Sequence, residues 1–516
     1  MSNELVLLYT GLLLLFTSVI YHFLNKERYS IFFLVLSSFF LFLSASFFYP
    51  FINLWDERFH ALVAKNLMNH PLMPTLYDDP VVNMLYSKGW DTYHIWLHKQ
   101  PLFMWQIALS YKLFGVNEFA LRLPSVILSS MLVFAGYRAG KILGNKNVGY
   151  YTGFLIATSS YLWQLISGRI EVDQNDVSFI VYISLSFWTW FEYVQTKKLK
   201  WLLLIGVFSG FAILCKWLVG LLVYLAWGLY SIIDNKFQFK KYWDILLSFL
   251  ITVLVFLPWQ ILTFKWYPVE AKLAFQHNAS HFMQVIEGHS GPFFYHFFLM
   301  PRLFGSLVPY LIIPALIVFY LRTSHKKISI VLTISILFVY LFFSITATKM
   351  PSFTSVIIIL LFISLAFLID FIIDNFQKLR LPPIIQNTIL VTAFLLFIYF
   401  RIDLVSIIKD KSLVGIGYDE GYKEYLSHNK KVFQNLLLPQ NAVIFNVGER
   451  GRHYIEAMYY TGLPAYSFIP SEEQCIDMKN KKRLIAIFKP KDGVLPDYLE
   501  KNNDIIVLKD TLDVCE

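Results

Sequence analysis

The segment Trp55-Asp56-Glu57-Arg58 opens a polar loop that ends at His98-Lys99-Gln100-Pro101-Leu102, and long apolar segments lie on both sides of it. Two adjacent carboxylates at the end of an apolar segment are costly to keep near hydrocarbon. Ionisable groups at that depth usually face a water-filled cavity and carry a function. Acids at one end of the loop, with a cation and imidazoles at the other, would suit a substrate that carries a phosphate. The alternative is a pair of solvated acids that caps the following helix.

The composition is that of a polytopic membrane protein. The chain has 516 residues, of which 57% are hydrophobic and 15% are charged, whereas a soluble domain carries about 25% charged residues. The mean hydropathy is +0.54. The net charge of +9 is distributed over short basic clusters between apolar runs. These clusters indicate topology rather than a nucleic-acid partner.

We expect an all-α membrane domain with about 12 transmembrane helices, since each spanning helix needs about 20 apolar residues. The candidate spans are residues 5–24, 31–52, 121–143, 148–168, 177–195, 200–215, 217–234, 242–260, 302–322, 328–346, 352–373 and 384–402. Basic clusters alternate along this series and are assigned to the cytoplasm by the positive-inside rule. The loops 53–120, 169–176 and 261–301 then share the exoplasmic face, which we expect to be the active face.

Two regions differ from the spanning helices. Residues 101–114 are apolar but short, and we expect an interfacial amphipathic helix that ends at Gly115. A short, tilted spanning helix is the alternative. After the transmembrane domain, residues 1–402, the composition becomes polar. We expect residues 403–516 to form a small exoplasmic α/β domain.

Within that C-terminal region, short apolar runs alternate with helical patterns. Strands are predicted at residues 442–447, 465–469, 483–488 and 504–508, and helices are predicted at residues 453–461 and 471–481.

Acidic residues form two groups on the predicted exoplasmic side. Asp56 and Glu57 form the first group, and the second contains Arg169, Glu171 and Asp173 at the outer end of the fourth span. Together, the two groups could hold one acceptor between a general base and an orienting acid. We therefore predict catalytic roles for Asp56, Glu57 and Asp173. A helix cap with a local ion pair is the alternative for the second group.

Cations in apolar surroundings form the second set of candidates. Lys99, Lys216 and Lys349 all lie near predicted exoplasmic ends of apolar segments. Such lysines could hold a phosphate as point charges, and an arginine could hold it as a bidentate fork. The predicted substrate-binding residues are Lys99, Arg169, Glu171, Lys216, Lys349 and Arg58. Snorkelling of isolated lysines is the alternative.

Histidines form the third set. His98 lies at the end of the first loop, and His277 and His281 have the spacing that places two imidazoles on one helical face. A divalent metal bound by His98 and His277 is one interpretation, and ordinary polar loop histidines are the other.

Taken together, these motifs resemble the membrane-embedded C-type glycosyltransferases. The resemblance covers residues 30–375 and is carried in order by Asp56-Glu57, Lys99-Gln100-Pro101-Leu102, Lys112-Leu113-Phe114-Gly115, Leu121-Arg122-Leu123-Pro124-Ser125, Arg169 to Asp173, Lys216, Leu257-Pro258-Trp259 and Lys349-Met350-Pro351. Within that superfamily, the chain is most similar to bacterial lipid A aminoarabinose transferases and to relatives of the dolichyl-phosphate-mannose protein mannosyltransferases.

The resemblance implies an enzyme of the bacterial inner membrane whose donor is a sugar on a polyprenyl phosphate. The acceptor would be lipid A, another glycan or a protein. By the same resemblance, Asp56 is the catalytic aspartate, Asp173 assists the acceptor and Lys99 holds the lipid phosphate. Some relatives bind zinc through an acid that precedes this lysine, whereas His98 stands there in this chain. His281 likewise stands where an arginine is common.

Two other functions share part of this pattern. A transporter or flippase of a lipid-linked saccharide also has many helices and cavity charges, but it usually shows internal repeats and broken helices at the midplane. We find no internal repeat, and the informative residues lie in long loops. A polysaccharide ligase would use the same donor side with a larger acceptor groove.

Overall fold

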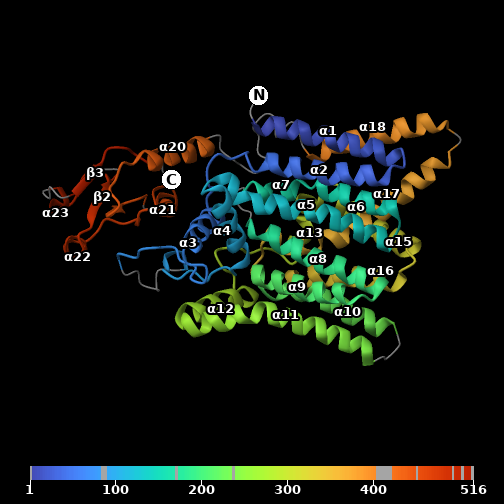
Figure 1. Cartoon of the computed structure of the whole chain (residues 1–516), viewed down its shortest axis with the longest axis horizontal. Helices are drawn as coiled ribbons and strands as arrows, with labels where there is room; N and C mark the ends of the chain where they lie inside the picture. The colour runs from blue at the N-terminus through green and yellow to red at the C-terminus, as the bar shows by residue number, and fades with distance from the viewer. Residues whose placement is uncertain are drawn as a thin grey trace. The chain divides into compact units, whose positions relative to one another are not determined.

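The computed structural model describes residues 3–82, 90–168, 173–234, 239–379, 381–402, 421–448, 451–490, 493–500 and 505–512. The chain divides into two compact units (Figure 1). Unit 1 contains Met1–Phe48, Arg122–Ser167 and Val172–Gly415. Unit 2 contains Tyr49–Leu121, here called the first loop, together with Gly168–Glu171 and with Ile416–Glu516, here called the C-terminal segment.

Unit 1 is helical, and its long helices run side by side (Figure 1). Its helices, including the greater part of α5, are α1 Asn3–Phe23, α2 Glu27–Ala45, α5 Glu118–Leu143, α6 Lys146–Ala157, α7 Ser160–Ile166, α8 Asn175–Thr196, α9 Leu199–Lys216, η3 Trp217–Leu221, α10 Leu222–Ile233, α11 Phe239–Trp266, α12 Pro268–Met283, α13 Tyr295–Phe298, α14 Met300–Phe304, α15 Val308–Arg322, α16 Lys326–Ile345, η4 Pro351–Ile357, α17 Ile358–Gln377 and α18 Pro383–Ile402.

Nine helical stretches among the described residues are long and apolar enough to cross a membrane. This finding confirms a multi-pass helical protein and corrects the expected count of about 12 spans. Predicted span 148–168 is divided into α6 and α7, and predicted span 302–322 yields the shorter helix α15. Predicted spans 200–215 and 217–234 form one stretch, Leu199–Ile233, because only the short 3-10 helix η3 separates α9 from α10.

The break between α6 and α7 is stabilised by a partly buried arginine of α18. Arg401 donates from Nε to the Thr158 hydroxyl at 3.1 Å and from Nη2 to the Leu155 carbonyl at 3.3 Å. Its Nη1 donates to the Phe304 carbonyl, at the end of α14, at 3.0 Å. Non-helical backbone is tolerated at membrane depth only where other groups bind its polar atoms. Arg401 supplies those groups.

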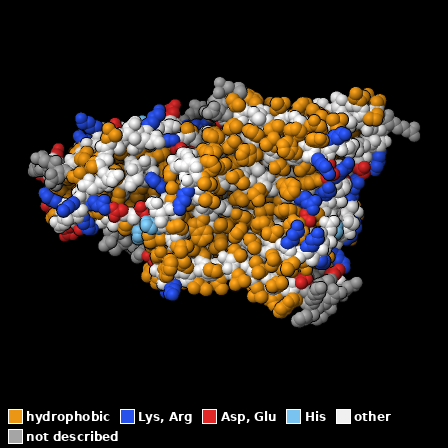
Figure 2. Space-filling view, viewed as in Figure 1, with side chains coloured by type: hydrophobic (Ala, Val, Ile, Leu, Met, Phe, Trp, Pro, Cys, Tyr) orange, Lys and Arg blue, Asp and Glu red, His pale blue; other side chains and the backbone are white. Residues whose placement is uncertain are grey.

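Charged residues at the ends of the unit 1 helices pair with one another. Glu27 binds Lys141, Asp234 binds Lys327, and Arg322 binds Asp374. Figure 2 shows hydrophobic side chains over most of the visible face of the helices and charged side chains gathered at one end. Each of the three ion pairs links the ends of two helices that carry neighbouring basic clusters. Such links are expected if the clusters lie on one side of the membrane.

Sidedness is testable by cysteine labelling. In a chain whose native cysteines are replaced, Asp79→Cys in the first loop and Asp477→Cys in the C-terminal segment should react with an impermeant thiol reagent in intact spheroplasts. Lys198→Cys, before α9, should react only after permeabilisation, because basic loops remain in the cytoplasm. The reverse labelling pattern would contradict the assignment of the active face.

Unit 2 contains a small α/β fold. Its elements are α3 Asp56–Leu67, η2 Trp90–Thr92, α4 Leu102–Phe114, α20 Gly421–Asn435, β1 Ala442–Phe445, α21 His453–Thr461, α22 Glu472–Asn480, β2 Leu484–Phe488, α23 Asp497–Glu500 and β3 Ile505–Leu508. The strands form a parallel sheet in the order β1-β2-β3. The predicted C-terminal α/β region is thereby confirmed. Ser471 begins α22 with a capping box to Gln474.

One predicted strand is wrong. Residues 465–469 run beside β1 and make only an isolated bridge, between Ile444 and Ala465. Tyr466 N–H donates to the Ile444 carbonyl at 2.8 Å, and Ile444 N–H donates to the Pro464 carbonyl at 2.9 Å. Proline cannot donate to a ladder, and Pro464 and Pro470 bracket this segment. Val447 N–H also donates to the Tyr466 carbonyl, and Asn446 N–H donates to the Phe468 carbonyl, each at 3.0 Å. The segment therefore runs beside β1 and its end through a few backbone bonds, without regular strand pairing.

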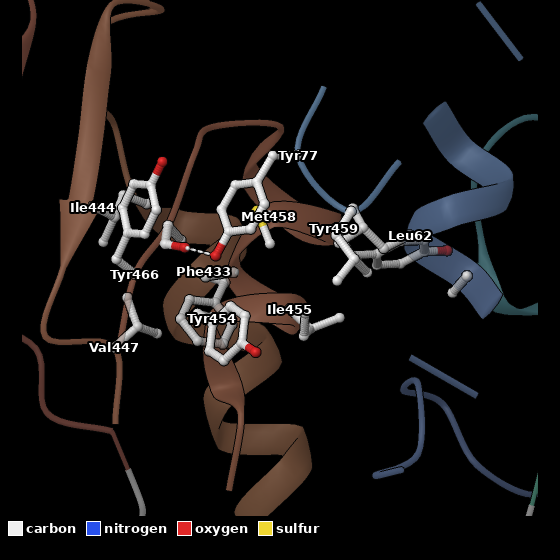
Figure 3. Close-up of a cluster of buried hydrophobic side chains, with 14 of the residues drawn as sticks. Leu62, Tyr77, Phe433, Ile444, Val447, Tyr454, Ile455, Met458, Tyr459 and Tyr466 are labelled. Atoms are coloured by element: carbon white, nitrogen blue, oxygen red, sulfur yellow. Dashed lines mark hydrogen bonds between the residues drawn. The ribbon is translucent and has the colours of Figure 1, made fainter. Parts of the chain in front are cut away.

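The first loop and the C-terminal segment share one hydrophobic core. This core includes residues of α3 and α4 together with residues of the sheet and of α21. Figure 3 shows Tyr459 of α21 pointing toward Leu62 of α3, and the Tyr77 hydroxyl of the first loop donating to the Ala465 carbonyl. The predicted boundary near residue 403 stays a prediction, since residues 403–420 lie outside the described part.

Helix α4 confirms the predicted helix and its end, whereas its location at the membrane interface stays a prediction. Gly115 follows it with φ +79°, a backbone region that favours glycine. Phe103, Ile107 and Tyr111 are buried in the core of unit 2, whereas Leu109 and Leu113 are exposed. A helix with apolar residues on its exposed face suits the membrane interface.

Candidate active site

The first acidic pair begins helix α3 through a sharp turn. Trp55, the residue before the helix, has φ +67°, which is unusual for a bulky residue and costs strain. Asp56 and Glu57 then occupy the first turn of α3. Glu57 is buried and accepts the Asn53 N–H at 2.6 Å. The turn separates the two acids, because Glu57 stabilises the turn internally while the Asp56 side chain stays 24% exposed.

Asp56 forms an ion pair with Lys99. The Lys99 Nζ lies 3.3 Å from Asp56 Oδ1, and both side chains are partly buried. The structure therefore brings the two ends of the polar loop together, as the sequence predicted. The pair places a carboxylate that can take up a proton directly beside a cation that can face a phosphate.

His98 stacks on a tryptophan of the first loop. Its ring lies 4.0 Å from the Trp90 ring, with an angle of 8° between the planes. His277 lies on α12 beside His281, whose Nδ1 is 2.9 Å from the His277 carbonyl. Among the described residues, neither His98 nor His277 belongs to a group of three or more side chains close enough to share a metal ion.

A histidine that we did not predict lies one turn after Asp56. The His60 imidazole is fully buried near Trp96 and Phe103, and a ligand atom of His60 lies within 4.8 Å of one of Asp56. These two groups could contribute to a divalent metal site, although structural zinc requires four ligands. The Asp-x-x-x-His spacing on a helix was the sequence feature that could have identified His60.

Arg58 is also placed differently from the prediction. We predicted substrate binding, but Arg58 is only 2% exposed, and its Nη1 lies 3.1 Å from Glu456 Oε1. Glu456 belongs to α21 of the C-terminal segment. This buried ion pair joins two distant parts of the sequence within unit 2, and no local pattern predicts it.

Asp173, from the second acidic group, belongs to unit 1. Lys216, the last residue of α9, lies 3.2 Å from Asp173 Oδ2 and 2.6 Å from Asp176 Oδ1. Asp173 Oδ1 accepts the Asn175 N–H at 3.0 Å. Lys216 and Asp173, predicted separately, therefore belong to one cluster with Asp176. Arg169 and Glu171 lie outside the described residues.

Lys349 caps a helix. Its Nζ donates to the carbonyls of Phe343, Ser344 and Thr346 at 3.0, 2.6 and 2.6 Å, at the end of α16. Burial lowers the pKa of its ammonium. Cations stabilise the carbonyl end of a helix, so these contacts by themselves support a structural role for the Lys349 ammonium.

Part of the chain matches a known family model, and a longer part is similar to curated relatives. The family model described as dolichyl-phosphate-mannose-protein mannosyltransferase matches residues 98–261. An undecaprenyl phosphate-alpha-4-amino-4-deoxy-L-arabinose arabinosyl transferase of Pseudomonas fluorescens (strain Pf0-1) is 24% identical over 306 residues, which are 56% of this chain and 52% of the relative. The chain spans about half or less of the length of the curated relatives it matches.

Comparison with solved structures gives the same fold. ArnT from Cupriavidus metallidurans, bound to undecaprenyl phosphate, matches with a TM-score of 0.60 and 15% identity over 88% of each chain. The archaeal oligosaccharyltransferase AglB from Archaeoglobus fulgidus, in complex with an inhibitory peptide and a dolichol-phosphate, matches with a TM-score of 0.56 and 10% identity over 85% of this chain and 64% of AglB. At these identities, the similarity establishes a shared fold.

Proposed function

We propose that this chain, which shares its fold and a family-model match with the membrane-embedded C-type glycosyltransferases, transfers a sugar from a polyprenyl-phosphate donor to an acceptor hydroxyl. The observation that carries the proposal is the Asp56–Lys99 pair at the start of α3, with 3.3 Å between Nζ and Oδ1. A general base and a phosphate-binding cation are the two groups that this reaction needs.

In the proposed reaction, Asp56 accepts the proton of the acceptor hydroxyl. The acceptor oxygen forms a bond to the anomeric carbon while the bond from that carbon to the phosphate oxygen breaks. The polyprenyl phosphate leaves with the bonding electron pair, and Lys99 stabilises its charge. A phosphate monoester is already a good leaving group, so no protonated acid is required. A single displacement of this kind inverts the anomeric configuration.

Other candidate residues have supporting roles in this proposal. Glu57 holds the turn that presents Asp56, through its bond from Asn53 N–H. Asp173 orients the acceptor, and Lys216 keeps its carboxylate in position. Arg169 and Glu171 are assigned to substrate binding by the family resemblance alone. Lys349 acts indirectly, through the end of α16 that it caps.

The names of the relatives support the substrate class. The curated relative from P. fluorescens is named as an undecaprenyl phosphate-aminoarabinose arabinosyl transferase, and ArnT was solved with undecaprenyl phosphate. A polyprenyl-phosphate sugar is therefore the proposed donor. Lipid A, another glycan and a protein are the candidate acceptors. The proposed location is the bacterial inner membrane, with the active face toward the periplasm.

Reconstitution tests this proposal directly. The purified chain, supplied with a polyprenyl-phosphate sugar and with lipid A or glycan fractions, should release polyprenyl phosphate and form a glycosylated acceptor, both detectable by mass spectrometry. The same lipid A and glycan fractions are then compared with those of a strain that lacks this protein. The acceptor is the molecule whose mass is lower by one sugar in that strain. Movement of the intact donor across vesicles without cleavage would instead support a flippase.

A further inference from the structure

Arg452 of the C-terminal segment lies between two tryptophans of the first loop. Its guanidinium carbon is 5.3 Å from the Trp55 ring centre and 5.3 Å from the Trp90 ring centre. Its Nε donates to Asp91 Oδ2 at 2.7 Å. All four residues belong to unit 2. A planar guanidinium can stack on aromatic faces and bind a carboxylate at the same time, which an ammonium cannot.

Each tryptophan is connected to one partner of the Asp56–Lys99 pair. Trp55 directly precedes Asp56 and carries the unusual backbone turn with φ +67°. Trp90 stacks on His98, the residue before Lys99, at 4.0 Å. Arg452 therefore contacts the residue before Asp56 directly and, through Trp90, is linked to the residue before Lys99.

A second, buried contact joins α3, which begins at Asp56, to α21, which follows Arg452. Glu456, one turn into α21, binds Arg58 of α3 through one carboxylate oxygen and His453 through the other, each at 3.1 Å. The Tyr425 hydroxyl of α20 bonds to the other nitrogen of His453. The side chains of Arg58, Glu456 and His453 are at most 3% exposed. This network fixes the first turn of α3 against α21.

From these contacts we infer that Arg452 is a positioning residue, which holds the Asp56–Lys99 pair in its reactive geometry from outside the matched family region. The inference rests on the proposed function. A displacement of about 1 Å in a catalytic group can reduce turnover by about 10²-fold. Arg452 acts through Trp55 and Trp90, so its loss should change the rate of the bound complex more than substrate binding.

The test uses the 516-residue chain in detergent and compares Arg452→Gln with Arg452→Lys. Arg452→Gln should lower kcat by about 10-fold or more and leave the donor KM within about twofold. Arg452→Lys keeps the charge without the planar stacking surface, so it should recover only part of kcat. Because the Arg452 side chain is 29% exposed, neither variant should unfold the protein.

Arg483→Gln is the matched control. Arg483 also joins the C-terminal segment to the first loop, through Asp79, but not at Trp55 or Trp90. Its loss should leave kcat unchanged. Equal losses in both glutamine variants, an unchanged kcat in Arg452→Gln, or a raised KM at constant kcat would each overturn the positioning role. Failure of the unmodified chain to transfer sugar would instead contradict the proposed function.

Discussion

Asp56→Asn is expected to reduce sugar transfer by about 10²–10⁴-fold, the range that general-base catalysis contributes. Asparagine keeps the size and a hydrogen-bonding oxygen of the side chain but cannot accept the acceptor's proton. The side chain is 24% exposed, so the substitution should leave folding intact. The measurement is single-turnover conversion of a polyprenyl-phosphate sugar, with donor binding followed separately.

Two variants make that result specific. Asp78→Asn changes another acid of the first loop, one that is about half exposed and lies near His70, and it should transfer normally. Glu57→Gln keeps an oxygen that can accept the Asn53 N–H, so a small loss is expected. Normal transfer by Asp56→Asn would show that another group accepts the proton, and the proposed mechanism would be wrong.

The membrane architecture was largely predictable because hydrocarbon imposes a simple rule on sequence. Long apolar runs identified the spanning helices, and the resemblance to the C-type glycosyltransferases is confirmed by the family model and the shared fold. The count of spans was too high partly because predicted span 148–168 is broken. Arg401 binds the backbone exposed at the break between α6 and α7, and a stabilised break cannot be recognised from hydropathy.

The site was predictable where both partners lie in recognisable motifs. Asp56 and Lys99 delimit one polar loop, and the structure pairs them at 3.3 Å. The roles of the buried cations Arg58 and Lys349 could not be predicted from the sequence. Arg58 pairs with Glu456, nearly four hundred residues away in the sequence, and Lys349 binds three carbonyls. Tertiary partners of this kind leave no periodic pattern around either residue.

The C-terminal segment and the first loop bury their hydrophobic residues in one core. The sequence presented residues 403–516 as an appended domain. However, α3, which carries Asp56, and α21 contribute to the same hydrophobic core. The first loop thus depends on the C-terminal segment for part of its buried surface, and we expect removal of that segment to disturb α3.

Glu456→Gln is expected to destabilise unit 2 by about 3–5 kcal/mol, the usual effect of removing one partner from a buried ion pair. The Arg58 and Glu456 side chains are each 3% exposed, so water cannot replace the lost carboxylate charge. The His453 ring would lose the charge of the same carboxylate. The free energy of unfolding is measured with the purified protein in denaturant, and limited proteolysis of the C-terminal segment reports its unfolding.

The matched control is Asp477→Asn. Asp477 of α22 pairs with Lys481, the residue after that helix, and both side chains are about half exposed. Exposed pairs contribute about 0–1 kcal/mol, so this variant should unfold almost normally. The double variant Arg58→Met/Glu456→Met should recover most of the lost stability, because apolar replacement of both partners removes the buried charge itself. Equal stability of Glu456→Gln and Asp477→Asn would show that the buried pair does not hold α3 to α21.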